Sequence, residues 1–160
     1  MCSSDLTGGT GAAGIGGGYG GAGGNVTIGA GTTVTATGTG SQFPGPAGIG
    51  GGAYGAGGPV TIAGTVTASS PFSAVGGGSS DNGVATAFFG SVTIKSGGIL
   101  RVPTGAMWIP DTNASGAEVV IEDGGLLAGS LPSSGGTVTA GTVRGGSATT
   151  GQIRNGGRIT

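Results

Sequence analysis

Short runs of β-branched residues alternate with polar residues along most of the chain. In Val26-Thr27-Ile28 and again in residues 33–37, single threonines separate the apolar side chains. A period of two places the apolar residues on one face of a strand and the threonines on the other. Clusters of glycine bound these runs, and glycine favours tight turns over helix. The pattern predicts very short strands with one buried face, joined at glycine-rich corners.

The strand pattern is part of a longer repeat. Residues 13–37 read AGIGGGYGGAGGNVTIGAGTTVTAT, and residues 47–68 read AGIGGGAYGAGGPVTIAGTVTA. An eroded third copy supplies the triplet at residues 92–94, so the three VTI triplets are 34 and then 32 residues apart. Repeats of roughly 20 to 50 residues built from short strands are typical of solenoids, propellers and arrays. Few aromatic residues and only two or three strands per repeat favour a solenoid over a propeller.

We therefore predict an all-β fold, a right-handed parallel β-solenoid (β-helix) with Gly-rich corners and loops. The AGIGGG, VTI and VTAT segments would form three faces of one coil, and successive coils would stack about 4.8 Å apart. The middle threonines of the triplets would point outward. The first and last residues would stack inside in two rows: Val26, Val60 and Val92, and Ile28, Ile62 and Ile94.

Residues 13–160 are expected to form a single solenoid. The glycine content of the whole chain, 44 residues, and its low charge depart strongly from an ordinary globular domain. The frequent Val and Ile and the repetition nevertheless argue against a disordered linker. The predicted repeats lie near residues 13–38, 47–69 and 73–105, followed by shorter coils over residues 116–160.

The first residues stand apart from the repeat. Residues 1–12 are expected to be artefactual or disordered. The hexapeptide Met-Cys-Ser-Ser-Asp-Leu resembles the translation of a sequencing-library adapter. In that case Cys2 and Asp5 would be foreign to the native protein, and the chain would be a fragment from metagenomic sequencing.

The repeats also resemble those of known surface proteins. The VTI-xxGG-xLxV style of strand, corner and strand is similar to the coils of pectate-lyase-like and autotransporter-type β-helices. The AGIGGG…GGAGG…VTI arrays resemble repeats in large surface proteins of anaerobic bacteria, some of which adjoin carbohydrate-binding β-helix domains. The resemblance covers residues 13–160 in style and 13–68 in the sharper repeat. It implies an adhesin-type repeat region located outside the cell or on its surface.

Composition excludes several function classes. The chain has no His, its charged residues amount to 7%, and its net charge is −1. Without His there is no Ser-His-Asp set and no His-ligated metal, and no basic stripe offers a nucleic-acid contact. No apolar stretch approaches the ~20 residues that span a membrane as a helix. We expect a non-enzyme with no catalytic residue, cofactor, metal site, nucleic-acid partner or membrane insertion, and we expect Glu122 and Asp123 in a solvated turn.

Aromatic residues are the candidate ligand contacts. Tyr19 and Tyr54 lie at near-equivalent positions of two repeats, and together with Trp108 they are the candidates for stacking on sugar rings. An alternative for Trp108 is that it fills or covers the solenoid interior. Thr-x-Thr pairs resemble the faces of ice-binding solenoids, but the variable coil length argues against a regular array.

These observations favour a structural stalk or adhesive repeat region of a secreted or cell-surface microbial protein. Its partners would be a polysaccharide or host surface and neighbouring domains of the same chain. The alternative is a carbohydrate-binding β-helix module. A polysaccharide lyase or hydrolase fragment and an ice-binding protein rank below both.

Overall fold

The computed structural model describes residues 2–40, 44–81, 91–103, 108–109, 118–129, 144–145, 152–155 and 158–159. All regular secondary structure in these ranges is β-strand, as the alternating pattern predicts. The strands are β1 (Cys2–Thr10), β2 (Ile15–Gly16), β3 (Val26–Ile28), β4 (Thr32–Thr39), β5 (Ala47–Gly50), β6 (Val60–Ile62), β7 (Thr65–Ser69), β8 (Ser73–Gly76), β9 (Ser91–Ile94), β10 (Ile99–Val102), β11 (Trp108–Ile109), β12 (Glu118–Ile121), β13 (Leu126–Gly129), β14 (Arg144–Gly145), β15 (Gln152–Asn155) and β16 (Arg158–Ile159).

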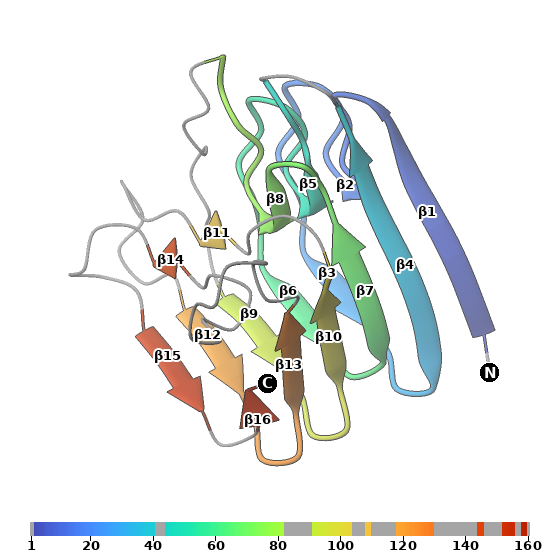
Figure 1. Cartoon of the computed structure of the whole chain (residues 1–160), viewed down its shortest axis with the longest axis vertical. Coiled ribbons are helices and arrows are strands. Elements are labelled where there is room, and N and C mark those ends of the chain that lie inside the picture. The colour runs from blue at the N-terminus through green and yellow to red at the C-terminus, as the bar shows by residue number, and fades with distance from the viewer. Residues whose placement is uncertain are drawn as a thin grey trace.

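The strands pair only with strands of neighbouring coils, and every described pair is parallel. One wall has the order β1-β4-β7-β10-β13-β16, a second β3-β6-β9-β12-β15, and a third β2-β5-β8, while β11 pairs with β14. Figure 1 shows the strands of each wall side by side, with the colour advancing coil by coil from one end of the molecule to the other. The predicted parallel β-solenoid is confirmed, and the AGIGGG, VTI and VTAT segments form its three walls.

The VTI triplets stack in register, as predicted. Val26 pairs with Val60 and Val60 with Val92, so the triplets lie over one another in one wall. Ile62 and Ile94 are fully buried, and the next rung continues the row with Val119 and Ile121. The middle threonines face outward. Side chains of one size therefore repeat at each level, which keeps the interior equally wide from coil to coil.

The other two walls complete a narrow apolar interior. In the first wall Val66, Leu100 and Leu127 occupy successive rungs and are fully buried. The third wall contributes Ile49 and Val75, also fully buried and paired with each other. Burial of each such side chain contributes about 1.5–3 kcal/mol. The apolar face of each short strand thus supplies the stability that its length alone would not.

The corner between the second and first walls repeats one turn geometry. After β9, Gly97 has a φ of 75°, and after β12, Gly124 has a φ of 80°. Across each turn the N–H of the next glycine donates to a carbonyl: Gly98 to Lys95 and Gly125 to Glu122, both at 2.8 Å. This left-handed conformation suits glycine because it lacks a Cβ.

The third wall ends in a stack of glycines that opens each coil outward. Gly16, Gly50 and Gly76 have φ values of 132°, 129° and 141° and lie over one another. A Cβ on Gly50 would lie 2.0 Å from the carbonyl oxygen of Gly76, so only glycine fits. Beyond this stack the chain leaves the wall in three loops, residues 17–24, 51–58 and 77–81, which we call the glycine arches.

Backbone hydrogen bonds between coils hold the glycine arches together. The N–H of Gly17 donates to the carbonyl of Gly50, and that of Gly52 donates back to Gly21, at 2.9 and 3.1 Å. The second arch is largely buried between its neighbours. Close approach of glycine backbones therefore extends the coil-to-coil ladder beyond the strands and fixes the arch tips in a row.

Both chain ends contain described strands of the solenoid. Cys2–Thr10 is not disordered: it forms β1, which pairs with β4 although its side chains are nearly all exposed. A parallel ladder uses backbone groups, so a segment without a core face can still add to it; the adapter origin of residues 1–6 stays a hypothesis. Among the described strands, Val92 pairs with Val119, which gives one shorter coil, and Val119 pairs with the more distant Ile153. Most of the other residues of the predicted shorter coils lie outside the described ranges.

The central isoleucine of the VTI stack provides a test of this packing. Replacing Ile62 by Ala should lower the free energy of unfolding by about 2–5 kcal/mol, because the cavity lies between two neighbouring isoleucines and cannot collapse easily. Chemical denaturation followed by circular dichroism measures the change. Thr61→Ala on the outer face of the same strand is the control, with an expected change below about 0.5 kcal/mol. Equal effects from the two variants would contradict the packing.

Candidate functional site

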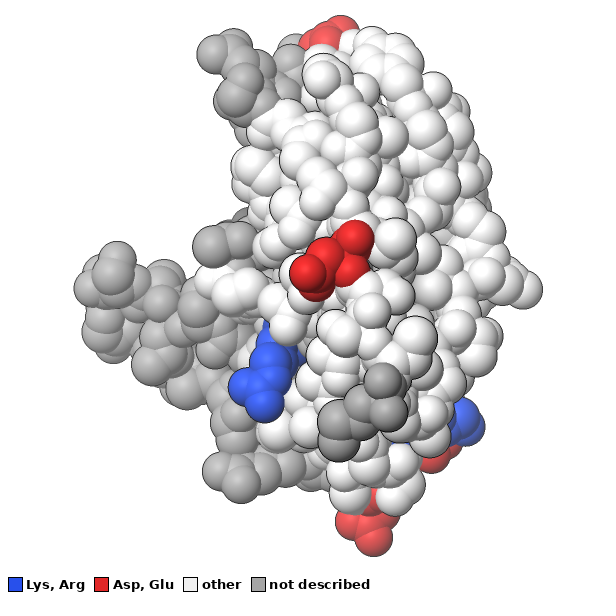
Figure 2. All heavy atoms as spheres, turned by 90° about the vertical axis from the view of Figure 1, so that its right-hand side faces the viewer, with Lys and Arg blue, Asp and Glu red and all other residues white. Residues whose placement is uncertain are grey.

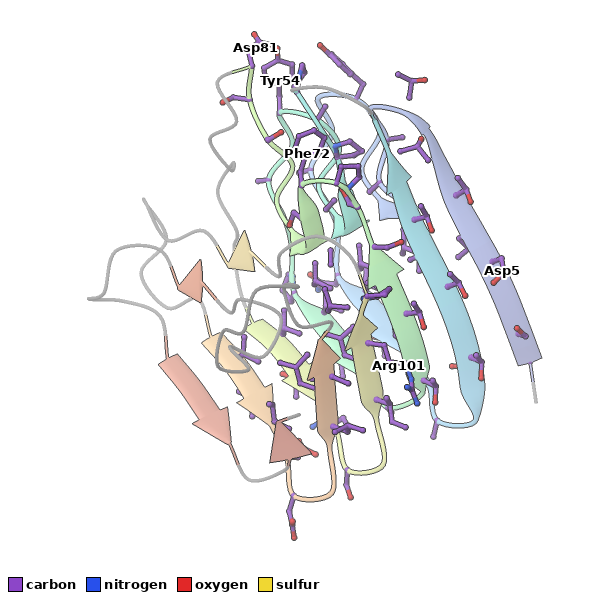
Figure 3. All side chains as sticks on the ribbon, in the orientation of Figure 1. Asp5, Tyr54, Phe72, Asp81 and Arg101 are labelled. Carbon is purple, nitrogen blue, oxygen red and sulfur yellow. The ribbon has the colours of Figure 1, made fainter. Side chains whose placement is uncertain are left out.

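The tips of the glycine arches bring together two tyrosines and a carboxylate. Tyr19 comes from the first arch, Tyr54 from the second and Asp81 from the third. Tyr19 is 66% exposed and Tyr54 38% exposed. Figure 3 shows Tyr54 and Asp81 beside each other at one extremity of the molecule, away from the β13 end of the solenoid. We call these three residues the arch-tip site.

The two tyrosine rings meet edge to face. Their centroids are 5.6 Å apart and their planes are inclined by 71°. The hydroxyl of Tyr54 donates a hydrogen bond to a carboxylate oxygen of Asp81, and its backbone N–H donates to the carbonyl of Ser79 at 3.1 Å. Each contact joins one arch to the next, so the site depends on the coil-to-coil register.

Tyr19 and Tyr54 lie at near-equivalent positions of the repeat, as the sequence indicates, and the register shows that they are offset by one residue. The register pairs Ile15 with Ile49, so the residue of the first arch that matches Tyr54 is Gly20. Gly20 has a φ of 70° and Tyr54 a φ of 63°, and Tyr54 is the one described non-glycine residue with a positive φ. This conformation costs a side-chain-bearing residue about 1–2 kcal/mol.

The pKa of the Tyr54 phenol is raised well above its usual range. The main cause is the hydrogen bond to Asp81; partial burial and the negative charge of that carboxylate add to it. A raised pKa means that the folded chain holds the proton more tightly than the unfolded chain. The stability from this contact is therefore complete below the ordinary value of 10.0 and is lost as the pH rises through the folded-state value.

Trp108 does not lie in one of the glycine arches. Trp108 lies in β11, where it pairs with Arg144 of β14. The orientation of its side chain lies outside the described residues, so neither the sugar contact nor the interior position proposed for it is tested.

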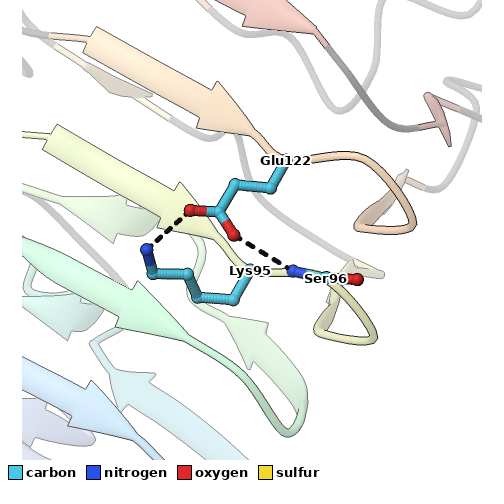
Figure 4. A network of polar contacts seen from close by, with 3 residues as sticks. All are labelled: Lys95, Ser96 and Glu122. Atoms are coloured by element: carbon cyan, nitrogen blue, oxygen red, sulfur yellow. Dashed lines mark hydrogen bonds and ion pairs between the residues drawn. The ribbon is translucent and has the colours of Figure 1, made fainter.

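A second polar cluster lies at the corners that follow β9 and β12 (Figure 4). The Lys95 ammonium donates to the Glu122 carboxylate at 2.6 Å, and the backbone N–H of Ser96 donates to the other oxygen at 3.3 Å. These contacts, the Lys95 hydrogen bond first, lower the pKa of Glu122. Both charged side chains are substantially exposed, so the pair adds little stability. Glu122 and Asp123 lie in the solvated turn that was predicted, and Glu122 joins this corner to the one before it.

A short hydroxyl ladder runs along the outer face of the first wall. Thr35 lies opposite Thr67 in register, because the loops absorb the variation in coil length. The variation in coil length was expected to prevent a regular threonine array. It does not, because the threonines of these two rungs stay aligned. The next rung ends the ladder, since Arg101 lies opposite Thr67 and Ile99 opposite Thr65. Two threonine rungs are a small surface for lattice recognition, and this observation does not favour ice binding.

Charged groups are few elsewhere on the described surface. Figure 2 shows few charged side chains on the face it presents, and most of that face is uncharged. Within the described ranges, no group of three or more His, Cys, Asp or Glu side chains could hold a metal ion. The same part of the chain contains no helix long and apolar enough to cross a membrane.

Comparison with known proteins gives no match. No protein-family model, no curated protein and no solved structure is significantly similar to the chain. The candidate site therefore has to be interpreted from its own geometry.

Titration of Tyr54 tests the arch-tip contact. In a Tyr19→Phe background, Tyr54 is the chain's one phenol, and its ionisation can be followed by ultraviolet absorbance. We expect the transition well above pH 10, and we expect Asp81→Asn to lower it, because the acceptor is then uncharged. Asp123→Asn, which removes an exposed carboxylate in the corner after β12, should leave it unchanged. A Tyr54 pKa that is insensitive to Asp81→Asn would show that the two side chains do not meet.

Proposed function

We propose that the chain is a structural stalk or adhesive repeat region of a secreted or cell-surface microbial protein. The observation that carries the proposal is the uninterrupted in-register stack of Val and Ile rungs through β3, β6, β9 and β12. Each coil contacts only its neighbours, so length can grow by adding coils without redesigning the core. A rod of this kind projects neighbouring modules from a surface, and its function is geometric.

The sparse charge is consistent with this role. Among the described residues, Lys95 and Glu122 form the one ion pair, and it is exposed. The rod is therefore held by backbone hydrogen bonds and apolar burial, which salt screens much less than surface ion pairs. Such a rod keeps its shape over a wide range of ionic strength, as an extracellular spacer requires.

Duplication of one coil tests the stalk. Residues 33–64 form one full turn, since Thr33 pairs with Thr65. A second copy inserted after Gly64 should fold as a new rung and move spin labels at Thr27 and Val120 apart by about 4.8 Å. A glycine-serine insertion of the same length should instead form a loop and leave the label distance unchanged. The stalk proposal is wrong if the duplicated coil behaves like that control.

A carbohydrate-binding β-helix module is the second candidate function. The observation that favours it is the exposure of Tyr19 and Tyr54 at neighbouring arch tips. Aromatic side chains with a polar end are suited to sugar contacts. The third wall would then serve as the scaffold that positions the arches.

Calorimetric titration against neutral plant and microbial polysaccharides separates the two functions. A carbohydrate-binding module should release or absorb heat with at least one glycan, and Tyr19→Ala should weaken that signal because it removes the more exposed ring. A purely structural stalk should give no heat with any of them. Heat that is unchanged in Tyr19→Ala would place sugar binding away from the arch tips.

A further inference from the structure

The ring geometry of the arch-tip site differs from that of a flat sugar platform. A platform needs ring faces that lie in one plane, whereas Tyr19 and Tyr54 are inclined by 71°. Inclined rings form a corner, in which a compact group can contact one face of each ring. The π-faces of tyrosine carry negative potential and attract cations.

A carboxylate lies at the same corner. Asp81 accepts the hydrogen bond from the Tyr54 hydroxyl through one oxygen. Among the described side chains no Lys or Arg forms an ion pair with Asp81: Lys95 pairs with Glu122, and Arg101 lies on the first wall, well apart from Asp81 in Figure 3. The negative charge therefore adds to the potential of the rings.

The backbone conformation of Tyr54 is a second, independent observation at this site. Its φ of 63° is one that glycine adopts freely, and the matching residue of the first arch is Gly20. A residue held in such a conformation at a cost is more common at binding and active sites than elsewhere. The arch would be less strained with glycine here, but the corner would then lose one ring and the hydrogen bond to Asp81.

We propose that Tyr19, Tyr54 and Asp81 form a binding site for an organic cation, a quaternary ammonium or protonated amine group. The two ring faces supply cation–π contacts and the carboxylate supplies the counter-charge. The site goes beyond the stalk function and does not depend on it. The ligand would be an amine-bearing or choline-bearing group of a surface polymer, recognised by charge and compact shape.

Choline and its uncharged isostere 3,3-dimethyl-1-butanol test this proposal by NMR titration of the whole chain. Exposed cation–π and ion-pair contacts are individually weak, so we expect choline to bind with a Kd of roughly millimolar size. The isostere has the same shape without the charge and should bind at least about tenfold more weakly. Equal binding of the two compounds would overturn the proposal, as would binding of neutral glycans at the arch tips without binding of choline.

Two variants separate binding from stability. Tyr54→Gly should weaken choline binding about tenfold with little change in the melting temperature, because relief of the left-handed backbone strain offsets the lost contact with Asp81. Asp81→Asn should weaken binding severalfold without changing the fold. Asp123→Asn, the matched carboxylate control in the corner after β12, should bind choline like the parent chain. If Tyr54→Gly or Asp81→Asn kept full affinity, the site would not be the arch tips.

Should Tyr54→Gly fail to fold, Tyr19→Ala provides the same test from the first arch. Tyr19 has an exposed side chain, so its removal leaves the interior intact. We expect a severalfold loss of choline affinity with an unchanged circular dichroism spectrum. Unchanged choline affinity in this folded variant would equally overturn the proposal.

Discussion

Parallel in-register pairing is the constraint on which the rest of the structure depends. Each strand hydrogen-bonds to the strand one coil before and one coil after it, so a residue at one level fixes what can lie at the next. Val60 between Val26 and Val92 satisfies this constraint because identical side chains stack without voids or clashes. The strands are only a few residues long and would not be stable alone. Their stability comes from repetition of the same short contact along the solenoid.

The glycine arches show how the chain departs from the repeat without losing register. Coil length varies, yet Val119 still lies over Val92 because the loops absorb the difference. Gly50 lies so close to Gly76 that no side chain fits between them, and this close approach carries the ladder out into the arches. The arches in turn fix their tips, so Tyr54 can meet Tyr19 on one side and Asp81 on the other. A candidate site thus arises from three coils that each contribute one residue.

The fold could be predicted from the sequence, whereas the site could be predicted only in part. The alternation in Val26-Thr27-Ile28 and its recurrence after 34 and then 32 residues indicate strand, burial and register together, since period and repeat are sequence properties. The two tyrosines could be proposed as exposed loop residues at near-equivalent positions, and the register adds that Gly20 is the residue matched to Tyr54. That match follows from the 34-residue spacing of the VTI triplets and was available from the sequence. Contact with Asp81 was not, because the third copy is too eroded to align its arch tip.

Cysteine cross-linking across the second wall tests the stacked interior most directly. With Cys2 replaced by Ser, Thr61→Cys combined with Thr93→Cys places two thiols on in-register partners of adjacent rungs. Stacked strands lie about 4.8 Å apart, within the Cα separation that a disulfide bridges, so mild oxidation should link them in high yield. Thr61→Cys combined with Lys95→Cys is offset by two residues, beyond about 7 Å, and should stay reduced. Efficient linking of the offset pair and failure of the in-register pair would contradict the solenoid.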